Sequence, residues 1–151
     1  MKKVVACLTV AAAAITLAAP ASAQFAKPED AVKYRQSAMF IMGQHFGRIG
    51  AMVNGKAPYD PAAAAASAEI VAEMSKLPWP GFHPSTDKLS QKAKSEIWTD
   101  TAKFKEASER LQAAAPKLAA AAKAGNMDTL KPAFQDAAGT CKNCHDNFRN
   151  Q

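Results

Sequence analysis

The stretch LKPAFQDAAGTCKNCHDNFR, from Leu130 to Arg149, combines a clear helical periodicity with the most reactive side chains of the chain. Its apolar residues recur with the spacing of one α-helical face: Leu130, Phe134, Ala137, Ala138 and Phe148. Cys141, Cys144 and His145 are separated by three and four positions, so a helix places them on that same face. The sequence therefore predicts a helix over about residues 128–149, with these three side chains on its inward side.

Several kinds of site use a Cys-x-x-Cys-His motif. Structural zinc needs four ligands, and few other histidines or cysteines are present. A thiol–disulfide oxidoreductase places such a pair at a helix N-terminus, where the thiol pKa is lowered, whereas this pair lies near a C-terminus. An inert disulfide is a further alternative. Haem attachment fits best, because two thiols can form thioethers with the vinyl groups and the next histidine can ligate the iron. We expect one covalent haem c per chain, with a thiol–disulfide oxidoreductase as the remote alternative.

The first 23 residues have the features of a secretory signal peptide. They comprise a basic start, an uncharged apolar run and a final triplet of small residues: Lys2–Lys3, residues 4–19 and Ala21-Ser22-Ala23. The apolar run is too short and alanine-rich for a convincing membrane anchor, and lipidation at Cys7 is a minor alternative. We predict cleavage after Ala23 and a periplasmic domain of residues 24–151, with two cysteines and no membrane anchor.

The charge of the chain is mildly positive and evenly scattered. Its formal net charge is +6, from 19 Lys and Arg against 13 Asp and Glu. No block of basic residues indicates a nucleic-acid surface. We expect no nucleic-acid partner, and the positive charge is compatible with acidic redox partner proteins.

Strand signals are nearly absent, whereas alanine-rich runs favour helix. Four helices are predicted, over about residues 28–53, 61–76, 96–124 and 128–149. Apolar residues of the first recur with the seven-residue repeat of a bundle helix, with one arginine among them: Val32, Arg35, Met39, Met42, Phe46 and Ile49. Proline and glycine exclude a regular helix from residues 77–94; Trp79 and Phe82 are expected to face the core and residues 85–94 to be exposed. Pro116 predicts a bend in the third helix.

These features resemble the cytochromes c′, the class II c-type cytochromes. The matching segments span nearly the whole mature chain, and the last is the most specific: KPEDAVKYRQSAM at 27–39, NGKAPYD at 54–60, LPW at 77–79 followed by Phe82, EIW at 96–98 and CKNCHDNFR at 141–149. The resemblance implies an all-α, antiparallel up-down-up-down four-helix bundle with covalently bound haem near the end of the last helix. It also implies a homodimer formed through the first two helices.

The resemblance assigns roles to individual positions. It implies that Cys141 and Cys144 hold the haem covalently and that His145 is the axial iron ligand. It places Arg35 near a haem propionate and Phe82 in the haem pocket. It also places Arg149 on the proximal side, although that residue could equally be a solvated arginine that favours the C-terminal end of the helix dipole.

Met39 leaves one question open. The resemblance places it over the distal face of the iron, where family members commonly carry an apolar residue and leave a five-coordinate iron that binds nitric oxide and carbon monoxide. A related low-spin branch uses a methionine in this region as the sixth ligand, and a thioether does ligate haem iron. His45 is expected to be exposed or near a dimer surface and His83 to lie in a loop, neither as an iron ligand.

The expected function follows from these assignments. It is electron transfer, binding of nitric oxide and carbon monoxide at a five-coordinate iron, or both. With Met39 bound to the iron, electron transfer alone is the alternative. The sequence shows no nucleophile–base pair or carboxylate dyad beside the motif, so we do not expect an enzyme.

Overall fold

The computed structural model describes residues 24–150, so the predicted signal peptide lies outside the described residues. The described part contains four long α-helices: α1 (Pro28–Val53), α2 (Pro61–Met74), α4 (Thr101–Lys123) and α5 (Met127–Phe148). A single short helix, α3 (Glu96–Thr99), and two 3₁₀ helices, η1 (Trp79–Gly81) and η2 (Pro84–Leu89), lie between α2 and α4. Residues 24–150 form no β-strand, only an isolated bridge between Ala93 and Arg149.

Local sequence signals set the ends of the helices. Asp60 accepts hydrogen bonds from the backbone N–H groups of Ala62 (2.9 Å) and Ala63 (3.1 Å), and thus caps α2. Asn126 accepts one from the N–H of Thr129 (2.9 Å) and caps α5. Gly55 and Gly125 follow α1 and α4 with φ of +69° and +73°, a conformation that glycine adopts without steric cost.

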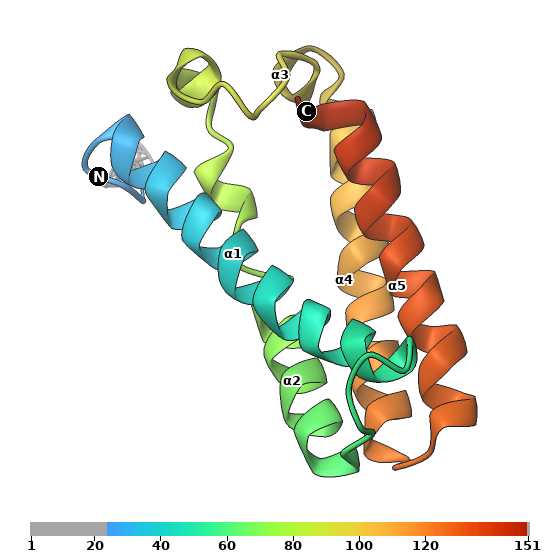
Figure 1. Cartoon of the computed structure of the whole chain (residues 1–151). Helices are drawn as coiled ribbons and strands as arrows, with labels where there is room; N and C mark the ends of the chain where they lie inside the picture. Colours follow the sequence, from blue (N-terminus) through green and yellow to red (C-terminus); the bar gives the residue numbers. More distant parts are fainter. Residues whose placement is uncertain (1–23, 151) are drawn as a thin grey trace, which may run out of the picture.

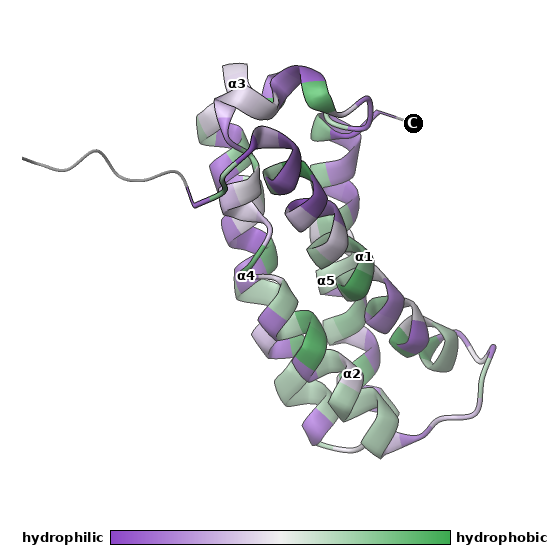
Figure 2. Ribbon diagram, turned by 90° about the vertical axis from the view of Figure 1, so that its left-hand side faces the viewer, coloured by the Kyte–Doolittle hydropathy of each residue, from purple (hydrophilic) through white to green (hydrophobic). Residues whose placement is uncertain are grey.

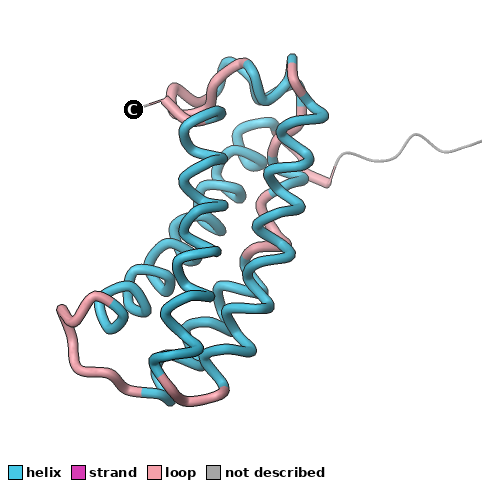
Figure 3. Tube along the Cα trace, turned by 90° about the vertical axis from the view of Figure 1, so that its right-hand side faces the viewer, coloured by secondary structure: helices cyan, strands magenta, loops and turns pink. Residues whose placement is uncertain are grey.

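The four long helices form the predicted bundle. Short turns join α1 to α2 and α4 to α5, and each helix packs on the next: α1 on α2, α2 on α4 and α4 on α5. The connections gather mainly at the ends of the bundle (Figure 3). Toward its N-terminus α1 diverges from α5, and η1 and η2 pack against that part of α1 (Figure 1). The all-α four-helix architecture predicted from the sequence is confirmed.

The main core lies in the half of the bundle that contains α2. It is built largely from small and aliphatic side chains, including Ile49, Val71, Leu118 and Leu130, none more than 1% exposed. Figure 2 shows that this half is also the more hydrophobic. Alanine is frequent in α2 and α4, and small side chains let helix axes approach closely. In the opposite half, where α1 and α5 diverge, fewer buried side chains fill the space between the helices.

Three details differ from the sequence expectations. The helix expected over 96–124 is interrupted at Asp100, whose side chain accepts a hydrogen bond from the N–H of Lys103 (3.3 Å) and starts α4 anew. The second helix ends at Met74 rather than near residue 76. Residues 85–94, expected to be exposed, contain the fully buried Thr86, because its hydroxyl is bonded to Arg35. Pro116 lies within an uninterrupted α4, so the bend there stays a prediction.

No helix within residues 24–150 combines the length and the hydropathy that crossing a bilayer would need.

Candidate cofactor site

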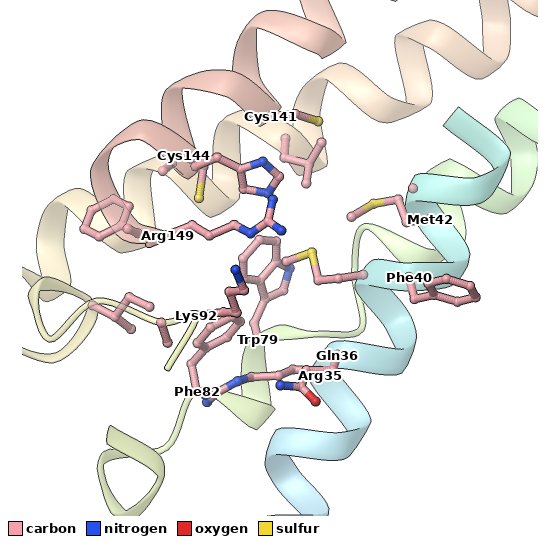
Figure 4. A pocket seen from close by; sticks show the side chains of 18 of the residues that line it. Arg35, Gln36, Phe40, Met42, Trp79, Phe82, Lys92, Cys141, Cys144 and Arg149 are labelled. Atoms are coloured by element: carbon pink, nitrogen blue, oxygen red, sulfur yellow. The ribbon is translucent and has the colours of Figure 1, made fainter. Parts of the chain in front are cut away.

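A cavity of about 560 Å³ is lined by residues of α1 and α5, which diverge toward the N-terminus of α1 (Figure 1). Side chains from α1, α4, α5 and residues 79–97 line it, together with Val71 of α2, and most are apolar or aromatic (Figure 4). This volume is within the range of small-molecule and cofactor pockets. The space lies where α1 diverges from α5, and several large aromatic side chains line it.

The three residues of the Cys-x-x-Cys-His motif all line this cavity. Cys141 and Cys144 are half-buried, whereas His145 is exposed to solvent. The sequence placed them together on an inward face, and the structure brings them to one wall. That wall borders the cavity rather than the closed core, which explains the exposure of His145.

The two thiols are unpaired in the structure. Burial raises the pKa of Cys141, and burial together with the charge of Cys141 raises the pKa of Cys144 to about 11. A thiol–disulfide oxidoreductase needs the opposite shift, because the thiolate is the nucleophile. The environment of the pair therefore disfavours that remote alternative.

His145 meets one requirement of a metal ligand, a neutral ring. Partial burial is the main cause that lowers its pKa, and the positive charge of Arg149 lowers it further, while Asp146 opposes the shift. At neutral pH the ring is therefore uncharged and has a free nitrogen lone pair.

Arg35 reaches the cavity from α1 and is only 3% exposed. Its Nη1 donates hydrogen bonds to the carbonyl oxygen of Gly81 and to Oγ1 of Thr86, both at 2.7 Å. The guanidinium lies 4.5 Å from the centre of the Phe82 ring. Its Nη2 is buried and has no hydrogen-bond partner among the described residues. A buried charged donor left unpaired is costly, so this atom calls for an anionic partner.

Two further cations, Lys92 and Arg149, line the cavity, and no Asp or Glu does so among the described residues. The backbone holds both near the motif. Lys94 donates from its N–H to the carbonyl of Phe148 (3.0 Å), and Asn150 donates to the carbonyl of Lys92 (3.1 Å). The loop before α3 is thereby tied to the end of α5. The cavity thus combines apolar walls with a positively charged border.

The remaining predicted site residues also reach the cavity. Met39, Phe82 and Arg149 all line it, with Met39 and Phe82 half-buried and Arg149 exposed. His83 lies outside it, in the loop, as expected, where it precedes η2. His45 also lies outside the cavity, and it is half-buried with a shielded Nδ1, so it is not the exposed side chain of one expectation; its position near a dimer surface stays a prediction. It belongs to a second seven-residue repeat, which runs Ala38, Met42, His45, Ile49 and Met52.

Sequence reasoning missed several residues of the site. Trp79 was assigned only to the core, and Lys92 to an exposed loop, yet both line the cavity. Thr86 and Gly81, which accept hydrogen bonds from Arg35, do not belong to any sequence motif. The only signal in the sequence was the density of proline and aromatic residues in 77–94, which marks a loop with a function but not its contacts.

The donors fit a flat, largely apolar cofactor that carries carboxylates. The aromatic and aliphatic walls suit a macrocycle, the unpaired Nη2 of Arg35 suits a carboxylate, and the motif offers two thiols and a neutral imidazole. Haem has these properties, and Cys-x-x-Cys-His is the pattern of its covalent attachment.

Comparison with known proteins agrees with this assignment. The family model described as Cytochrome C′ matches residues 30–149. Cytochrome c′ of Alcaligenes xylosoxydans xylosoxydans is 50% identical over 126 residues, 83% of this chain and 98% of the relative. Cytochrome c′ of Rubrivivax gelatinosus is 46% identical over 127 residues, again 83% and 98% of the two chains.

Solved structures show the same relation. The crystal structure of cytochrome c′ from Rubrivivax gelatinosus superposes with a TM-score of 0.80 at 46% identity, and covers 84% of this chain and all of that one. The nitric oxide complex of a variant cytochrome c prime from Alcaligenes xylosoxidans has a TM-score of 0.78 at 48% identity, with 85% and 99% covered. Sequence and structure therefore agree that this chain belongs to the cytochrome c′ family, a family of haem proteins.

Proposed function

We propose that this protein is a periplasmic c-type haem protein, not an enzyme, which binds diatomic gases and transfers electrons. The observation that carries the proposal is the convergence of Cys141, Cys144, His145 and the unpaired Nη2 of Arg35 on one apolar cavity. When bound, haem supplies an iron that exchanges one electron and can take a small ligand.

The proposed roles follow from the position of each side chain. Cys141 and Cys144 anchor one haem c through thioethers, and the neutral ring of His145 is the axial ligand. Arg35 neutralises a propionate, and Phe82 packs in the pocket and against the guanidinium. Arg149 lies on the proximal side, next to the ring of His145, whose pKa it lowers.

Binding of nitric oxide and carbon monoxide is supported by the α1 side of the cavity. There the lining includes Met39, Met42 and Phe46, and it contains no histidine or lysine from α1. A relative of 48% identity has been solved as a nitric oxide complex. We infer that Met39 packs over a five-coordinate iron and leaves room for a diatomic gas.

The alternative is a low-spin protein in which Met39 is the sixth ligand, so that electron transfer is the sole function. One observation keeps it open: Met39 lines the same cavity as His145 and carries a sulfur that can ligate iron. The two functions differ in what Met39 does, not in how the cofactor is attached.

An absorption spectrum of the reduced protein, with and without carbon monoxide, tests the proposed function. We expect a high-spin spectrum, ready carbon monoxide binding and little change in Met39→Ala. A low-spin spectrum that becomes high-spin in Met39→Ala would establish the alternative. The mass of the denatured periplasmic protein is expected to equal residues 24–151 plus one haem, and a mass without haem would refute the proposal.

The predicted homodimer through α1 and α2 belongs to the same proposal. Phe40 is 66% and Ile41 41% exposed, an unusual exposure for neighbouring large apolar residues on one helix. Sedimentation is expected to show a dimer that Ile41→Glu weakens. A monomer already in the wild-type protein at micromolar concentration would contradict this assignment. Acidic redox partners remain compatible with the positive border of the cavity.

A further inference from the structure

Thr86 belongs to none of the sequence motifs, yet it is fully buried and accepts a hydrogen bond from Arg35. Its hydroxyl proton is donated to the carbonyl oxygen of His83 (2.7 Å). A hydroxyl has one proton, so the contact with Arg35 uses an oxygen lone pair, which accepts from Nη1 at 2.7 Å. The direction of both hydrogen bonds is thereby fixed, and Thr86 acts on Arg35 as an acceptor only.

The loop that carries Thr86 is itself held close to α1. A Cβ built on Gly81 would lie 2.7 Å from the carbonyl oxygen of Ala31 and 2.8 Å from Cβ of Arg35, so only glycine allows this approach. The indole Nε1 of Trp98 donates to the carbonyl oxygens of His83 (3.2 Å) and Phe82 (3.3 Å). The loop that carries the Thr86 hydroxyl, which accepts from Arg35, is therefore held by α1 on one side and by Trp98 on the other.

These contacts use one end of the guanidinium and leave the other free. Nη1 is taken by two acceptors, Phe82 lies against the group, and Nη2 is the buried atom without a partner among the described residues. Arginine stays protonated in proteins, so the free end is a fixed charged donor beside the cavity.

We propose that Thr86 is a positioning residue, which holds Arg35 through Nη1 so that Nη2 is presented to a carboxylate of the cofactor. This inference rests on the proposed function, because the carboxylate is that of the haem. Without the acceptor at Thr86, Arg35 would have rotamers that point away from the cavity, and its positive charge would move away from the cofactor.

The test compares three haem-loaded variants by spectroelectrochemical titration at fixed pH. Thr86→Val keeps the shape and removes the acceptor, whereas Thr86→Ser keeps the hydroxyl. Ser75→Ala is the matched control, because Ser75 is also fully buried and donates to a backbone carbonyl, that of Ala72 (2.7 Å), but it does not bond Arg35. A fixed cation near the iron disfavours the oxidised state. We expect a lower reduction potential in Thr86→Val, and wild-type values in Thr86→Ser and Ser75→Ala.

A second comparison separates positioning from a structural role. If Thr86 acts through Arg35, then Thr86→Val changes the potential only when Arg35 is present. Arg35→Gln alone and the double variant then give the same shift, at least as large as that of Thr86→Val. An unchanged potential in Thr86→Val, or additive shifts in the double variant, would overturn the inference. Thr86→Ala replaces Thr86→Val if the latter does not accumulate. Absence of haem in the wild-type protein is a different result, which would refute the proposed function itself.

Discussion

At the scale of single residues, the space around a position can decide which residue occupies it. Gly81 is the clearest case, because a methyl group there would meet the backbone of Ala31 at 2.7 Å. Backbone atoms cannot move aside as the end of a flexible side chain can. The residue is therefore needed for the close approach of η1 to α1, which in turn positions the carbonyl that accepts from Arg35.

Gly81→Ala is expected to lower the free energy of unfolding by about 1–3 kcal/mol, the usual cost of overpacking. Gly139→Ala is the control, because nothing lies within 4 Å of a Cβ at that helical position. It should be neutral or stabilise by about 0.5–1 kcal/mol, since alanine favours helix over glycine. Urea unfolding of the two holoproteins gives both values, and equal stability would contradict the steric account.

At the scale of elements, the ends of the helices are set by short polar side chains. Asp60 accepts from two backbone N–H groups at the start of α2, whereas Asp100 accepts from one, at 3.3 Å, at the start of α4. The sequence does not predict the second cap, because Asp100 stands within a continuous helical pattern. The short helix α3 exists because that cap interrupts the pattern.

Asp60→Ala is expected to cost about 1 kcal/mol of stability, the typical value for a lost N-cap. Asp60→Asn keeps an acceptor oxygen and should restore most of it. Asp100→Ala should cost less than Asp60→Ala, because one longer hydrogen bond is lost instead of two. Thermal unfolding followed by circular dichroism ranks the stabilities of the three variants. A larger loss of stability in Asp100→Ala than in Asp60→Ala would contradict the explanation by capping hydrogen bonds.

At the scale of the whole molecule, the bundle has a filled half around α2 and a half that surrounds the cavity. A cavity of about 560 Å³ without its occupant forfeits the contacts of its walls. Stability should therefore be unequal along the bundle when the cofactor is missing. The part of α1 before Met42 and residues 79–94 should open first, because they pack mainly around the cavity.

The double variant Cys141→Ala/Cys144→Ala tests this expectation, since it cannot form thioethers. We expect no covalent haem, a thermal midpoint lower by roughly 5–10 °C as the stabilisation by a tightly bound ligand is lost, and faster amide exchange in residues 28–41 and 79–94 than in α2. Cys7→Ala is the matched control, because Cys7 lies in the predicted signal peptide and the mature protein should be unchanged. Uniform loss of protection along the chain would contradict a two-part bundle.

The sequence by itself determined the fold class, the approximate ranges of the four long helices and the identity of the motif residues. These depend on local spacing, caps and periodicity, which are properties of neighbouring positions. The tertiary structure decided where Thr86, Gly81, Trp79 and Lys92 lie, that His45 is half-buried and that His145 is exposed. Those outcomes depend on the divergence of α1 from α5 and on the path of the proline-rich loop. Both bring together residues about 50 positions apart, as for Arg35 and Thr86, whose separation is 51, and no short-range pattern encodes such a contact.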